Sequence, residues 1–166
     1  MNKFFNEFRN DHRQIRDLVL GSITAITNEN IEKAKKLLEK LDEVAGPHFR
    51  FEEEALYPKL IPIYGVGYIE KLYIDHDLAI ARFERLKSIL NKRNLNADEI
   101  ETVISLLREL LPHLSDCEGL TIILELFDGK RIAKILKAMN NARKENLGLL
   151  AWSNTTRNRR HLTLIN

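Results

Sequence analysis

The chain has 166 residues, of which 44% are apolar and 30% are charged, and its formal net charge is +2. This size and composition are typical of one soluble globular domain, and no apolar run reaches the roughly 18 residues of a membrane-spanning helix. Residues 1–9 interleave Phe with Asn, Glu and Arg, which is helical spacing and not the order of a signal peptide. With Cys117 as its one cysteine the chain has no internal disulfide, and we predict a cytoplasmic protein.

The charged side chains are distributed unevenly along the chain. Residues 1–129 hold 17 basic and 23 acidic side chains, whereas residues 130–166 hold 9 basic and 1 acidic. A basic end can bind nucleic acid or anionic lipid, but it can equally be the exposed face of a last helix lying on an acidic bundle. We favour the second interpretation, so nucleic-acid binding is not predicted.

Apolar residues recur at three- and four-residue intervals through most of the chain, which predicts amphipathic helices. The first helix is expected over about 2–27. The second is expected to begin near Asn30, to bend at Pro47 and to end near Pro58. The segment from Pro58 to Gly67, which contains a further proline and two glycines, is predicted to be a loop.

Three more helices are expected in the second half of the chain. The third runs from about Tyr68 to Asn91, and Asp98 is the expected cap of a fourth that reaches about Phe127. A fifth, shorter helix follows, and from Ser153 onward the chain is polar and has no helical pattern.

Long helices joined by short loops pack most simply in an up-down-up-down order. The predicted fold is therefore all-α, an up-down-up-down four-helix bundle with a short additional C-terminal helix. We assign the bundle to residues 1–128 and the basic C-terminal helix with its polar tail to residues 129–166.

An internal repeat links the two halves of the chain. Two dipeptides recur at offsets of 64 and 65 residues: Asp11-His12 as Asp75-His76, and Pro47-His48 as Pro112-His113. Within each half the two histidines are 36 and 37 residues apart, about the length of one helix, a turn and the return on an antiparallel partner. We therefore expect all four histidines to meet in the middle of the bundle, where facing helices build metal sites.

Acidic side chains accompany these histidines. Glu52 lies four residues after His48, so on a helix both side chains point the same way and can reach one cation. His113 is followed by Asp116 and Glu118, each within about a turn and a half. Four imidazoles and two carboxylates suit iron or manganese better than the thiolate-rich sites of structural zinc. Carboxylates can also bridge two cations and offset their repulsion.

Two other candidate ligands are interpreted differently. Cys117 lies four residues after His113, and we interpret it as a small apolar filler beside the site. His161 lies in the polar tail close to two arginines, and we interpret it as a solvated side chain.

Motifs of several enzyme classes are absent from the sequence. No glutamate stands three residues before any of the four histidines, as the Glu-x-x-His motif of ferritin-like oxidases requires. There is no His-Glu-x-x-His zinc-protease motif, no Walker loop and no nucleophile motif around a serine. The sequence therefore gives no support to a hydrolase.

The ordered set of histidines and carboxylates resembles the hemerythrin-like (HHE) cation-binding domain over about residues 1–128. The residues that carry the resemblance are His12, the His48-x-x-x-Glu52 pair, His76, and His113 with Glu118. The resemblance implies a four-helix bundle around two non-haem iron ions with an oxo or hydroxo bridge. It makes the four histidines terminal ligands and gives Glu52 and Glu118 the role of bridging the two ions.

The chain departs from the oxygen-carrying members of this family at the third-helix ligand. They have an extra histidine one turn from the third-helix ligand, whereas Leu72 and Ile80 stand at those positions around His76. The centre is in this respect similar to those of proteins that repair damaged iron centres. Glu118 lies five residues after His113, a spacing that a π-bulge would make workable, and Asp116 is the alternative second carboxylate.

Three functions are compatible with such a centre. The first is a binding protein that takes O2 or NO for storage, delivery or sensing. The second is redox or repair activity on NO, peroxide or damaged iron-sulfur clusters, and the third is a sensor coupled to a partner through the basic end. The family's repair proteins carry an additional N-terminal domain, whereas this sequence starts at its first helix, so we expect a binding protein more than an enzyme.

Overall fold

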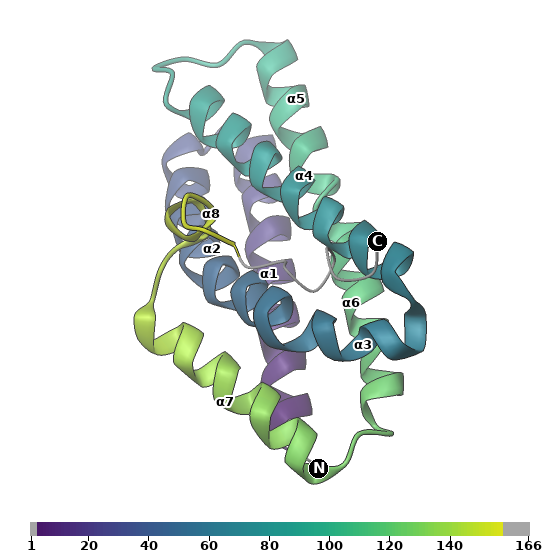
Figure 1. Cartoon of the computed structure of the whole chain (residues 1–166). Coiled ribbons are helices and arrows are strands. Elements are labelled where there is room, and N and C mark those ends of the chain that lie inside the picture. Colours follow the sequence, from purple (N-terminus) through teal and green to yellow (C-terminus); the bar gives the residue numbers. More distant parts are fainter. Residues whose placement is uncertain (1–2, 158–166) are drawn as a thin grey trace.

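The computed structural model describes residues 3–157, and all regular secondary structure in that range is helical. Four antiparallel segments form a bundle (Figure 1): α1 (Lys3–Thr27), α2 (Ile31–Phe51), α4 (Val66–Leu90), and α5 (Ala97–Arg108) followed by α6 (Leu111–Leu124). They run up, down, up and down, which confirms the predicted all-α bundle. None of the helices in the described range is both long and apolar enough to cross a membrane.

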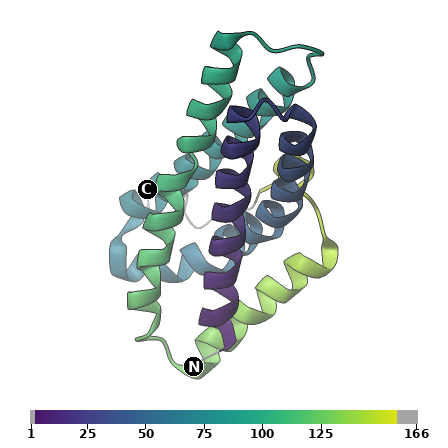
Figure 2. The same ribbon diagram turned by 180° about the vertical axis from the view of Figure 1, so that it is seen from behind.

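The remaining elements connect or cover these four segments. The π-helical turn η1 (Glu52–Leu56) and α3 (Tyr57–Tyr64) lead from α2 to α4, and α7 (Gly129–Glu145) and α8 (Leu149–Ser153) follow the bundle. Viewed from behind, α1 lies beside α5 and α6 along its whole length (Figure 2). On its other side α1 packs against α2.

The segment predicted as a loop, Pro58 to Gly67, is helical apart from Gly65, so that prediction was wrong. Pro58 lies in the first turn of α3, where a proline N–H is not needed for the helical ladder. The chain turns at Gly65 and not at Pro58. The φ of Gly65 is 78°, a value that glycine adopts readily. The second predicted helix therefore passes through Pro47 and η1 and ends at Tyr64.

The predicted fourth helix is two helices. Glu109 and Leu110 separate α5 from α6, whose first turn contains a proline. The cap of α5 is Asn96 and not Asp98. The Asn96 side chain accepts from the backbone N–H of Glu99, and the Glu99 carboxylate accepts from the backbone N–H of Asn96, which is a complete capping box.

The C-terminal helices are part of the packed structure. α7 has 17 residues, longer than expected, and packs against α2 and η1, whereas α8 packs against α2 and α4. Arg143 of α7 forms ion pairs with Glu7 and Asp11 of α1, so this basic helix lies on an acidic face of the bundle. The structure describes the polar tail only as far as Arg157, and His161 lies outside the described residues.

The buried apolar side chains form two clusters, one toward each end of the bundle. On α1, Phe8 belongs to one cluster and Ile15 to the other, and His12 lies between them. On α4, His76 lies between the two clusters in the same way. The predicted histidine level is therefore a buried polar layer between two apolar cores.

We predict that Gly46→Ala destabilises the protein by about 1–3 kcal/mol, because overpacking forces backbone to move. A Cβ at Gly46 would lie 2.2 Å from the backbone oxygen of Leu147, in the loop that precedes α8. The matched control is Gly119→Ala in α6, where a Cβ meets nothing within 4 Å. That change is expected to stabilise the helix by roughly 0.5–1 kcal/mol. Urea unfolding followed by circular dichroism measures both, and equal free energies for the two variants would contradict the prediction.

Candidate metal centre

The structure brings the predicted ligands together in two groups of three. His12 from α1, His48 from α2 and Glu52 from η1 each offer a ligand atom, and these atoms lie within 4.8 Å of one another. Glu52, His76 from α4 and His113 from α6 form a second group by the same criterion. All five side chains are buried, and Glu52 is completely inaccessible to solvent.

Glu52 belongs to both groups through different oxygens. Its Oε1 lies 3.4 Å from Nε2 of His48 and 4.0 Å from Nε2 of His12. Its Oε2 lies 3.2 Å from Nε2 of His76. This is the arrangement that a carboxylate adopts when it bridges two cations.

Three of these ligand atoms have no hydrogen-bond partner among the described residues: Nε2 of His12, Nε2 of His48 and Oε1 of Glu52. Leaving a buried polar atom unsatisfied costs about 1–3 kcal/mol. A cation placed between the three atoms would satisfy all of them at once. The donor set, imidazole nitrogen with carboxylate oxygen, suits iron, so the residues present fit the metal that the sequence predicts.

Each histidine also has a carboxylate near its Nδ1 atom. The pairs are Glu118 with His12 at 2.8 Å, Asp11 with His48 at 3.3 Å, Glu53 with His76 at 3.0 Å, and Asp75 with His113 at 3.9 Å. A carboxylate that accepts from Nδ1–H fixes the tautomer in which Nε2 is free to bind a metal. Sequence reasoning missed three of these carboxylates, although the repeated Asp-His dipeptide was a signal for two of them.

Glu118 has a different place from Glu52. Its carboxylate accepts from Nδ1 of His12 and from Nε of Arg9, and 41% of its side chain is exposed. α6 is a regular α-helix, and the one π-helical turn among the described residues is η1, so no π-bulge accompanies Glu118. Asp116, the alternative, pairs with Lys71 at the surface. The role of Glu118 as a second bridging ligand stays a prediction.

A family model described as the hemerythrin HHE cation-binding domain matches residues 3–120. The chain belongs to this family. The matched region runs from α1 into α6 and contains all six predicted ligands of the hemerythrin-like centre. Comparisons with curated proteins and with solved structures gave no match.

The hemerythrin-like centre includes a tyrosine that sequence reasoning missed. In η1 the backbone N–H of Tyr57 donates to the carbonyl of Glu52, five residues earlier, and so the two side chains share one side of the chain. The Tyr57 hydroxyl lies 3.3 Å from Oε2 of Glu52, 3.0 Å from Nε2 of His76 and 3.3 Å from Sγ of Cys117. On a regular helix a five-residue offset would not have predicted this contact.

Aromatic rings cover the imidazoles within the bundle. The Phe49 ring stacks on His76 with a centroid distance of 3.8 Å, and the Phe8 ring contacts both His12 and His48. These rings have no polar atoms, so they keep water from the apolar sides of the imidazoles.

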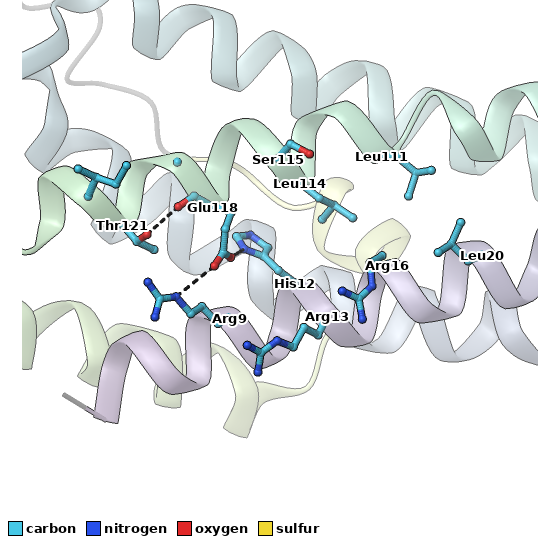
Figure 3. Close-up of a pocket in the computed structure, with 12 residues that line it drawn as sticks. Arg9, His12, Arg13, Arg16, Leu20, Leu111, Leu114, Ser115, Glu118 and Thr121 are labelled. Atoms are coloured by element: carbon cyan, nitrogen blue, oxygen red, sulfur yellow. Dashed lines mark hydrogen bonds and ion pairs between the residues drawn. The ribbon is translucent and has the colours of Figure 1, made fainter. Parts of the chain in front are cut away.

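A groove of about 740 Å³ runs between α1 and α6 and has His12 and Glu118 among its lining residues (Figure 3). Arg9, Arg13 and Arg16 of α1 line one side, and apolar side chains of α6 line much of the other. Figure 3 shows the side chains of His12 and Glu118 pointing toward each other across this groove. The groove reaches His12 and Glu118, whereas Nε2 of His12, Nε2 of His48 and Oε1 of Glu52 are buried behind it.

The last described residue reaches the second group. The guanidinium of Arg157 donates to both oxygens of Glu53 and pairs with Asp77 at 2.8 Å. It also lies over the ring of Trp152, 4.9 Å from the centroid. Arg157 thus holds the carboxylate that accepts from Nδ1 of His76.

The four histidines differ in their affinity for protons. Burial alone lowers the pKa of His48, but the carboxylates of Glu52 and Asp11 outweigh burial and raise the pKa to about 9. Burial and the charge of His76 lower the pKa of His113 to about 3. Without a metal, a proton on His48 therefore stabilises the buried Glu52 carboxylate, which is the task that a cation would take over.

We predict that the metal-free protein is most stable near pH 6.5, the ordinary pKa of histidine. Folding raises the pKa of His48. Its contribution to the free energy of unfolding is therefore fully present below pH 6.5 and is lost as the pH rises toward 9. Folding lowers the pKa of His113, so below pH 6.5 the unfolded chain binds a proton that the folded chain does not. The free energy of unfolding therefore falls as the pH decreases from 6.5 toward 3. At about 1.4 kcal/mol per pKa unit, these shifts correspond to about 3 kcal/mol for His48 and about 5 kcal/mol for His113.

Urea unfolding of chelator-treated protein across this pH range measures the effect. His48→Gln is expected to reduce the loss of stability on the alkaline side and to keep the loss on the acidic side. Part of the alkaline loss remains because Glu52 and Glu53 raise the pKa of His76 against the effect of burial. A free energy of unfolding that rises between pH 6.5 and 9 would contradict the assigned shift of His48.

Proposed function

We propose that this hemerythrin-like chain holds two non-haem iron ions and binds O2 or NO at them for storage, delivery or sensing. The observation that carries the proposal is the placement of Glu52, a fully buried carboxylate whose two oxygens face different histidines. His12, His48 and Glu52 would hold the first ion, and Glu52, His76 and His113 the second. Glu118, beside His12, is the predicted additional ligand of the centre.

The charges around the site support two cations. Five carboxylates lie on or beside the four imidazoles: Glu52, and Asp11, Glu53, Asp75 and Glu118 on the Nδ1 side. Two divalent ions would bring four positive charges into a space where these five negative charges offset them. Binding would release the proton that His48 carries without metal.

The protein's own residues favour a small, uncharged ligand. Three protein ligands for each ion, with Glu118 as the predicted further ligand, leave coordination positions open, as in other metal sites that bind small molecules. When bound, two ferrous ions supply the electrons that hold a diatomic molecule. The rings of Phe8 and Phe49 exclude water from the imidazoles, and the groove beside His12 is the side from which we propose that the ligand enters. A cytoplasmic location, part of this proposal, would keep the Cys117 thiol reduced.

A redox or repair function, acting on NO, peroxide or damaged iron-sulfur clusters, is the second candidate. The observation in its favour is that two oxidisable side chains, Tyr57 and Cys117, contact the ligands His76 and His113. Such groups can transfer electrons or protons during turnover, whereas a reversible carrier has no need of them.

Metal analysis tests the centre itself. We expect two irons per purified chain, loss of both in Glu52→Ala and loss of one in His48→Ala, with little change in the folding of the apoprotein. Glu54→Ala is the matched control, because Glu54 lies in the same turn but pairs with Arg50 at the surface. Full iron retention in Glu52→Ala would overturn the proposal.

Glu118→Gln is the variant that decides the role of Glu118. Loss of an ion would support the predicted bridging role. A weakening of about 10- to 100-fold in iron affinity, matching that of Glu53→Gln, would assign Glu118 to holding His12 alone.

Optical spectroscopy separates the two candidate functions. Reduced protein exposed to O2 and then to vacuum should gain and lose its charge-transfer bands over repeated cycles if the chain is a carrier or sensor. NO supplies the parallel measurement. Irreversible conversion of the spectrum, with consumption of O2 or peroxide, would favour the redox function and count against reversible binding.

A further inference from the structure

The internal repeat extends from the histidines to the carboxylates that hold them. Glu53 and Glu118 are 65 residues apart, and each lies five residues after the second histidine of its half. Glu118 accepts from Nδ1 of His12 at 2.8 Å, and Glu53 accepts from Nδ1 of His76 at 3.0 Å. The two carboxylates therefore have equivalent positions in the structure.

The repeat is broken at the arginine that pairs with such a carboxylate. In the first half Arg9 lies three residues before the first histidine and donates from Nε to Glu118 at 3.1 Å. Tyr73 stands at the equivalent place in α4, 64 residues later, and its hydroxyl donates to the backbone oxygen of Glu53 at 3.2 Å. A tyrosine hydroxyl carries no positive charge. The second half therefore has no arginine at the position from which the first half holds its carboxylate.

The C-terminal segment supplies an arginine to this carboxylate instead. Nε of Arg157 lies 3.1 Å from Oε2 of Glu53, and Nη2 donates to Oε1, the oxygen that also accepts from Nδ1 of His76. Two parallel N–H bonds from one planar guanidinium fix the plane of a carboxylate. Arg157 lies outside the range that the family model matches, residues 3–120.

Arg157 is itself held in one place. Its Nη1 lies 2.8 Å from Oδ1 of Asp77, and its guanidinium carbon lies 4.9 Å from the centre of the buried Trp152 ring. Only 16% of the Arg157 side chain and 2% of the Glu53 side chain are exposed. Removing one partner of an ion pair this deeply buried leaves the other charge without its counterion in a place that water does not reach.

We infer that Arg157 is a positioning residue of the metal centre. Through Glu53 it would fix the ring of His76, whose Nε2 lies 3.2 Å from Oε2 of Glu52, so that this nitrogen stays free to bind the second ion. The inference rests on the proposed two-metal function. The basic C-terminal segment, assigned from the sequence to a separate region at 129–166, would then complete the centre.

Iron(II) binding to the full-length protein, measured without oxygen in competition with a chelator, tests the inference. In Arg157→Gln we expect one of the two ions to bind about tenfold more weakly, the lower end of the effect of losing a direct hydrogen-bond partner of a metal ligand. The affinity of the other ion should not change. Arg157→Gln should have no further effect in protein that already carries Glu53→Gln, because the arginine acts only through that carboxylate.

Arg50→Gln is the matched control. The Arg50 guanidinium also joins a C-terminal helix to η1, through Glu145 of α7 and Glu54, but these two partners lie outside the metal centre. Both iron affinities are expected to stay at the wild-type values in this variant. A tenfold loss in Arg50→Gln would show that any ion pair to the C-terminal helices has the same effect, and it would overturn the specific role of Arg157.

The other outcomes separate this inference from the proposed function. If Arg157 only fastens the C-terminal segment, Arg157→Gln lowers the free energy of unfolding and leaves both iron affinities unchanged, which overturns the inference while the two-metal centre stands. An equal loss of affinity with and without Glu53→Gln also overturns it. Wild-type protein that binds no iron overturns both proposals. If Arg157→Gln does not fold by circular dichroism, Arg157→Lys, which keeps the charge without the planar fork, takes its place and is expected to weaken the same ion.

Discussion

The buried carboxylate of Glu52 is the constraint on which the rest of this structure depends. A charge taken out of water costs several kcal/mol unless partners of opposite charge meet it with good geometry. Here the carboxylate faces imidazoles from α1, α2, α4 and α6, and a proton on His48 or a cation between the rings supplies the opposite charge. The imidazoles can reach one carboxylate only if four helices present them at the same level. The contacts of Glu52 therefore fix how the four helices align with one another along the axis of the bundle.

Two features of the chain make that layer possible. Apolar clusters lie on both sides of the polar layer, so the layer is enclosed by apolar packing and does not lie at an end of the bundle. The π-helical turn at Glu52–Leu56 inserts an extra residue per turn, and this brings Tyr57 to the side chain of Glu52 and to His76. Such turns are costly in a regular helix and recur at functional sites.

The two halves of the centre are related by the repeat but are not equivalent. The first group of ligands borders a groove lined by arginines, and its outer carboxylate, Glu118, is exposed to solvent. The second group is enclosed by Tyr57 and Cys117, and its outer carboxylate is held by Arg157 from the C-terminal segment. The first group therefore lies beside a groove, whereas the second group is enclosed by Tyr57, Cys117 and the Arg157–Glu53 ion pair.

Most of the helices, the level of the four histidines and the pairing of His48 with Glu52 followed from the sequence, because helical periodicity and i,i+4 spacing are local properties. Three features did not follow. The helix through Pro58, the break before Pro112 and the turn that carries Tyr57 depend on packing against neighbours, which overrides local signals. The carboxylates on Nδ1 come from other helices or from the opposite half of the repeat, so only the tertiary structure could show that Asp11 holds His48 and that Glu118 holds His12. The residue types of the ligands can be identified from the sequence alone. Which side chain each ligand contacts depends on how the antiparallel helices pack against one another.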